Sequence, residues 1–150
     1  MHTPACAKAM FILAGAVSVA APAAAQNDFA SRVIDYSPAP GQFVSDPAFN
    51  DPTRALGAPV GGGTINPDLS SLVSLGGFGG SITLAFDNPV ENDPDNPLGL
   101  DFIVFGNAFY VGANPNRRWA EAGLVEISFD TNSNGLADDA WFTIPGSALN

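Results

Sequence analysis

The chain has 150 residues, 46% of them hydrophobic, and its 15 Asp and Glu against 5 Lys and Arg give a formal charge of −10. So acidic a surface repels nucleic acid and anionic lipid, because binding to either needs cationic groups that release counterions. It suits hard, oxygen-binding cations, above all calcium, although an acidic surface also simply keeps a protein in solution.

Residues 1–25 have the three parts of a secretory signal peptide. Lys8 lies in a short n-region, an apolar helix is expected from about residue 10 to residue 20, and small residues precede a cut after Ala25. The apolar run is about half of the ~20 residues that cross a bilayer, which disfavours an uncleaved anchor. We therefore predict a soluble mature protein in the periplasm, on the cell surface or in the medium. A buried Ala-rich helix is the alternative.

Cleavage of this signal would change the chemistry that the chain can perform. The single Cys (Cys6), the single His (His2) and the single Lys (Lys8) all lie inside it, and four Arg remain against the 15 acidic residues, a formal charge of −11. The mature chain could form no disulfide, no thiolate or imidazole metal site, and no Ser-His-Asp or Cys-His nucleophile system. Oxygen ligands and binding functions are what remain.

Residues 26–63 are rich in Pro, Gly and Asp, and we expect an irregular segment with one short helix over 51–57. Asp51 is placed to cap this helix, Pro52 suits its first turn and Gly57 its end. The glycines at 61–63 indicate a flexible loop.

Residues 64–150 are predicted to form the β domain. Short apolar or alternating runs separated by turn residues indicate strands at 72–75, 81–86, 100–105, 124–129 and 141–144. The run 100–105 is apolar almost throughout, so we expect it to be buried on both faces. The fold class is therefore all-β, an antiparallel sandwich. Five strands are few for a closed sandwich. We therefore also expect that the sandwich is incomplete at its C-terminal end and that the chain is a fragment of a longer protein.

The glycine cluster at 76–80 does not read as a phosphate loop. A strand rather than a helix follows it, and the mature chain has no Lys. A tight turn with close backbone approach is the favoured interpretation.

The segment 130–139 carries the strongest functional signal. Short oxygen-bearing side chains recur at its positions one, three, five and nine with Gly at six, as in the first half of an EF-hand loop. A loop that curls round a small ion points every second side chain inward. Six residues are the predicted calcium ligands, Leu136 through its carbonyl and the others through side-chain oxygens: Asp130, Asn132, Asn134, Leu136, Asp138 and Asp139.

Two features leave an alternative open. Trp141 stands at position twelve, where an EF-hand has a bidentate Glu, and strands rather than helices are expected on both sides of the loop. Asp139 is the substitute ligand in this interpretation. An ordinary Asn134-Gly135 hairpin turn with solvated acids is the competing interpretation.

Other residues offer weaker functional signals. Glu121 and Glu126, joined by Asp101, have the chemistry of a glycosidase carboxylate pair, but solvated acids are the commoner explanation. Three aromatic residues flank Asn114-Pro115-Asn116 and offer a surface for stacking on sugars, or else cover the edge of the core: Phe109, Tyr110 and Trp119.

Two blocks of sequence carry a family resemblance. Residues 74–86 (SLGGFGGSITLAF) and 100–109 (LDFIVFGNAF) resemble a family of bacterial exported and cell-surface proteins with an LGGxGGSITLxF…DFxVFxNAF core, some with PEP-CTERM-type sorting tails. Residues 130–139 are also similar to thrombospondin type 3 calcium loops. The resemblance covers about residues 33–147. It implies a jelly-roll-like β-sandwich without established catalysis.

The sequence thus predicts a secreted or surface-attached, non-catalytic, calcium-stabilised β module that acts in adhesion or in glycan or matrix binding. A carboxylate-dependent polysaccharide hydrolase and a structural fragment of a longer surface protein are the alternatives.

Overall fold

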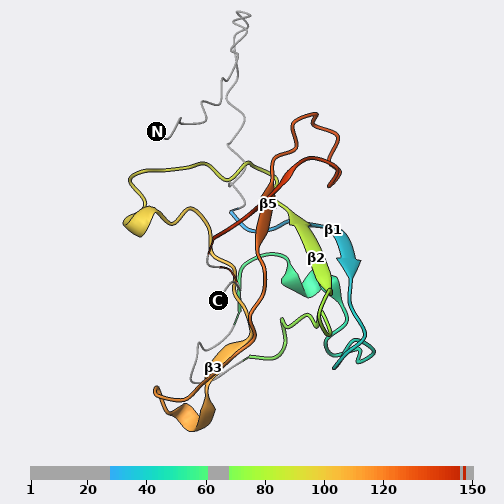
Figure 1. The fold of residues 1–150 in the computed structure, drawn as a ribbon, viewed down its shortest axis with the longest axis vertical. Helices are drawn as coiled ribbons and strands as arrows, with labels where there is room; N and C mark the ends of the chain where they lie inside the picture. The colour runs from blue at the N-terminus through green and yellow to red at the C-terminus, as the bar shows by residue number, and fades with distance from the viewer. Residues whose placement is uncertain (1–27, 61–67, 146, 148–150) are drawn as a thin grey trace, which may run out of the picture.

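The computed structural model describes residues 28–60, 68–145 and 147. The predicted signal peptide and the glycine loop at 61–63 lie outside these residues. Within them the regular structure consists of short strands and single 3-10 turns, arranged as three separate two-stranded antiparallel sheets (Figure 1). The described residues are thus all-β at the level of antiparallel pairing, as the sequence predicts.

The first sheet pairs β1 (Arg32–Ser37) with β2 (Ser81–Ala85). The alternating run at 81–86 is thus confirmed as a strand. β1, however, lies in the segment expected to be irregular and joins it to the predicted β domain. The register shifts between Val33 and Asp35, and a bulge of this kind interrupts the period-two pattern by which a strand is found in a sequence.

A 3-10 turn, η1 (Pro52–Ala55), packs against β1 and confirms the short helix expected there. Asp51 caps it: one carboxylate oxygen accepts hydrogen bonds from the Thr53 hydroxyl (2.7 Å) and the Thr53 backbone N–H (3.0 Å). Ala30, beside this contact, is the one buried apolar side chain among the described residues, and its carbonyl accepts the Gly57 N–H at 2.9 Å.

The same cap predicts a pH dependence. The Thr53 hydroxyl first, and then the Thr53 N–H, hold the pKa of Asp51 below its ordinary value of 3.8. Because the folded pKa is lowered, the cap's stabilisation is complete above the unfolded value and is lost as the pH falls through the folded pKa. An NMR titration of Asp51 should show a midpoint below 3.8, and Thr53→Val should move it upward. A midpoint at or above 3.8 would contradict the cap.

The glycine cluster forms a tight corner, as its composition predicts. A Cβ on Gly76 or Gly80 would overlap the carbonyl oxygen of Ala39 or Leu75, and Gly41 packs against the backbone of Gly76 and Gly77. Close backbone approach is thus confirmed here.

Hydrogen bonds hold the residues before this corner onto the N-terminal part of the chain. The Tyr36 hydroxyl donates to the Ser74 carbonyl (2.6 Å), and the Ser74 N–H donates to the Phe49 carbonyl (2.7 Å). The Ala39 N–H donates to the Leu75 carbonyl (3.0 Å). The run 72–75 is anchored in this way without forming one of the strands.

The expectation of a doubly buried strand at 100–105 is wrong. This segment forms no strand, and its large apolar side chains are mostly exposed. It follows η2 (Pro97–Gly99), and Asp101 accepts hydrogen bonds from the Asp93 N–H (3.1 Å) and the Asn96 side chain (3.3 Å). The loop at residues 91–96 therefore binds the Asp101 carboxylate, and no strand among the described residues pairs with the segment 100–105.

The remaining sheets are hairpins. β3 (Ala108–Tyr110) pairs with β4 (Arg118–Ala120) across η3 (Val111–Ala113), and β5 (Glu126–Ser128) pairs with β6 (Trp141–Thr143). Figure 1 shows these two hairpins reaching toward opposite ends of the molecule. β5 and β6 confirm the strands expected near 124–129 and 141–144, whereas β3 and β4 were not predicted.

Candidate calcium loop

The candidate loop joins β5 to β6, as the sequence predicts. The register pairs Ser128 with Trp141, so the chain between them, residues 129–140, forms one long connection. A two-residue Asn134-Gly135 hairpin is therefore not what forms. Instead Ser133 (φ 57°) and Gly135 (φ 72°) adopt the left-handed conformation, which curls the chain inward.

Asp130, at the first loop position, organises the backbone. One of its carboxylate oxygens accepts the Asn134 N–H at 3.1 Å and the other accepts the Gly135 N–H at 2.8 Å. These bonds draw the loop around the carboxylate and leave each oxygen with a free lone pair. The Asp130 side chain is half-buried, so water competes less with a cation for its oxygens.

The next ligand candidates form a chain of side-chain contacts. Asn132 accepts the Asn134 N–H at 2.9 Å, and the Asn134 amide oxygen accepts the Leu136 N–H at 2.8 Å. The Asn134 amide nitrogen donates to both oxygens of Asp138, at 3.0 and 3.3 Å. These bonds bring the side chains at loop positions one, three, five and nine together. The Asn134 side-chain amide donates to the Asp138 carboxylate where a bound cation would contact it.

Asp139 behaves differently from the other acids. The Thr131 hydroxyl donates to its Oδ1, whereas its Oδ2 is buried and has no hydrogen-bond partner. A buried carboxylate oxygen without a partner is costly, and a cation would satisfy it. Asp139 therefore has the exposure and chemistry expected of a ligand that stands in for the missing Glu.

The donor set is one of mixed oxygens rather than clustered carboxylates. Within residues 28–60, 68–145 and 147, no three His, Cys, Asp or Glu side chains converge closely enough to hold a metal ion. Amide and carbonyl oxygens from Asn132, Asn134 and Leu136 would thus have to complete a site, and calcium accepts such ligands.

One positive charge lies beside the loop. A Cβ built on Gly135 would lie 3.7 Å from Nη1 of Arg32, at the start of β1. The guanidinium thus sits near the mouth of the loop, although Arg32 is far from it in sequence. Nothing in the local sequence of residues 130–139 indicates this neighbour.

The three carboxylates considered for catalysis are not gathered in one place. Glu126 lies on β5 and accepts the Thr143 hydroxyl at 3.1 Å, while Glu121 is exposed after β4. Asp101 lines an open cavity of about 230 Å³ that includes neither of them. This cavity has acidic and apolar walls, formed by Asp28, Phe86, Asn88, Pro89, Val90, Glu91 and Asp101.

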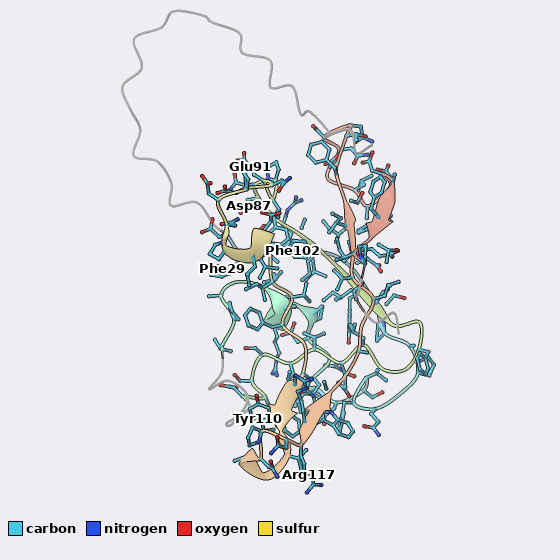
Figure 2. All side chains as sticks on the ribbon, turned by 60° about the vertical axis from the view of Figure 1, so that its left-hand side comes forward. Phe29, Asp87, Glu91, Phe102, Tyr110 and Arg117 are labelled. Carbon is cyan, nitrogen blue, oxygen red and sulfur yellow. The ribbon has the colours of Figure 1, made fainter. Side chains whose placement is uncertain are left out.

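Two of the three aromatic residues considered for sugar stacking, Phe109 and Trp119, share one face of the β3–β4 hairpin, whereas Tyr110 lies on the other face. The β3–β4 register places Phe109 opposite Trp119 and Tyr110 opposite Arg118. Trp119 is 51% exposed. Figure 2 shows Tyr110 and Arg117 at the end of the molecule that this hairpin forms, away from Asp87 and Glu91.

Comparisons with protein-family models, curated proteins and solved structures find no match to this chain. In the part of the chain that the structure describes, no helix is long and apolar enough to cross a membrane.

Proposed function

We propose that this chain is an exported, non-catalytic β module whose loop 130–139 binds calcium, and that it acts in adhesion or in glycan or matrix binding. The observation that carries the calcium proposal is the unpartnered Oδ2 of Asp139, in a loop already curled round Asp130. The signal-like residues 1–25 and the resemblance to exported surface proteins support the export.

The architecture belongs to the same proposal. We take the three antiparallel ribbons as parts of a jelly-roll-like sandwich, in which β1–β2 and β5–β6 come from different regions of the sheets. The position of Arg32 beside Gly135 supports this, because it places the start of β1 at the tip of the β5–β6 ribbon.

Arg32 should weaken calcium binding. A unit positive charge close to a bound divalent ion weakens its binding by roughly 1 kcal/mol in water. Arg32→Gln is therefore expected to lower the calcium dissociation constant about three- to tenfold in calorimetry at low salt. The difference between the two proteins should be smaller at 0.5 M salt, because salt screens the charge of Arg32. Arg118→Gln, on β4, is the matched control. Unchanged or weaker binding by Arg32→Gln would contradict this placement.

The glycan proposal rests on the exposed Trp119. Cosedimentation with insoluble cellulose, chitin and peptidoglycan is expected to show binding to at least one of them. Trp119→Ala should then weaken that binding about tenfold, because stacking on an indole ring contributes roughly 1 kcal/mol or more. Trp141→Ala, which removes an exposed indole from β6, should leave it unchanged. Binding that survives Trp119→Ala would place the glycan elsewhere.

A further inference from the structure

One face of the β3–β4 hairpin carries a charged side chain beside the exposed indole ring. The register pairs Phe109 with Trp119. The Val111 N–H donates to the Arg117 carbonyl at 2.8 Å, which continues the pairing by one step. Directly opposed residues of an antiparallel pair share a face, and residues two apart along a strand do too. Arg117 therefore shares a face with Phe109 and Trp119. Arg118 lies on the opposite face.

Arg117 has a fixed backbone and a free guanidinium group. Its N–H donates to the Asn114 carbonyl at 2.9 Å, and this bond closes the turn that precedes β4. Its side chain is exposed, and among residues 28–60, 68–145 and 147 the guanidinium has no hydrogen-bond or ion-pair partner. Figure 2 shows Arg117 at the outer end of the hairpin. The N–H donors of this group are therefore available to a ligand.

The hairpin is the basic part of an acidic chain. No Asp or Glu occurs between Asp101 and Glu121, and the same stretch contains two of the four Arg. Glu121 is the nearest acid along the chain, but four residues of extended strand separate it from Arg117 by about 13 Å, with Trp119 between them. Arg117 thus presents an uncompensated positive charge at the outer end of the face.

We propose that this face binds a carboxylated glycan, in which one sugar ring stacks on Trp119 and a uronic acid carboxylate accepts hydrogen bonds from the Arg117 guanidinium. The inference rests on the proposed glycan function and names the class of sugar. The planar guanidinium matches the two oxygens of a carboxylate, and the indole offers an apolar surface to the ring. The two side chains start about 7 Å apart along the strand, so one short oligosaccharide can contact both.

The test uses uronic acid trimers, of galacturonate and of mannuronate, each paired with its neutral methyl ester. The purified full chain is titrated with each trimer and followed by NMR in a chelator-containing buffer, so the result does not depend on calcium. We expect at least one acid trimer to bind about fivefold tighter than its ester, as one exposed charged pair contributes. The difference should narrow at 0.5 M salt.

Two adjacent arginines locate the contact, because they lie on opposite faces and carry the same charge. Arg117→Gln should remove the preference for the acid and leave binding of the ester within twofold. Arg118→Gln should keep the preference. Trp119→Ala should weaken acid and ester alike.

Three results would overturn the inference. Equal affinity for acid and ester, with both weakened by Trp119→Ala, would leave the glycan function standing without a choice of acidic sugars. A preference that Arg117→Gln and Arg118→Gln reduce equally would reflect overall charge rather than this face. No binding of any trimer or ester would contradict the glycan function as well.

Discussion

Replacing Asp130 by Ala should abolish calcium binding and remove every calcium-dependent rise in melting temperature. Asp130 is the first ligand position, and its two oxygens also hold the N–H groups of Asn134 and Gly135. The variant therefore loses a charged ligand and the hydrogen bonds that curl the loop. We expect no heat of binding up to 10 mM calcium. Without calcium, we expect the free energy of unfolding to fall by about 1 kcal/mol, because the Asn134 and Gly135 N–H groups each lose a hydrogen bond to the carboxylate.

Glu126→Gln is the matched control for this result. It removes one negative charge from the same ribbon but none of the proposed ligands, so calcium binding should stay within about twofold of the original protein. Asp139→Asn should weaken binding and leave the loop backbone in place, because its Oδ2 holds no backbone group. Calcium binding that persists in Asp130→Ala would show that the ion lies elsewhere.

Replacing Gly80 by Ala should be strongly destabilising. The new Cβ would overlap the Leu75 carbonyl oxygen and lie 2.8 Å from the Ala39 nitrogen. Both neighbours are backbone atoms, so the corner has to open and the Ala39–Leu75 hydrogen bond is lost. We expect a loss of about 3 kcal/mol or more in urea unfolding, in the range of overpacked and strained sites.

Two other glycines separate the effect of close packing from the effect of a left-handed backbone conformation. Gly79 has a left-handed φ of 91° but open space around its Cβ, so Gly79→Ala should cost only about 1 kcal/mol. Gly123 has neither constraint, and Gly123→Ala should be neutral or slightly stabilising. Similar losses at all three positions would mean that the corner is not closely packed.

Local patterns predicted the local structure well. The cap at Asp51 depends on a neighbour two residues away, whereas the strand at 81–86 and the glycine corner are recognisable from their own sequence pattern although they contact β1 and Ala39. The inward-curling loop at 130–139 is local in the same sense as the cap, because its hydrogen bonds join residues no more than eight positions apart.

Features that depend on distant neighbours were missed. β1 escaped because its bulge breaks the alternation, and β3 and β4 are too short to show one. The run 100–105 looks buried from its apolarity alone, but burial requires a partner that the sequence does not name. For the same reason the neighbour of the loop, Arg32, could not be foreseen.

Calorimetric titration of calcium into the purified protein tests the central claim most directly. We predict one site with a dissociation constant on the order of 0.1–1 mM, as in extracellular modules. At 10 mM calcium this corresponds to a stabilisation of about 1–3 kcal/mol and a melting temperature higher by several degrees. No heat and no melting shift at 10 mM calcium would contradict the account of loop 130–139 as a calcium site.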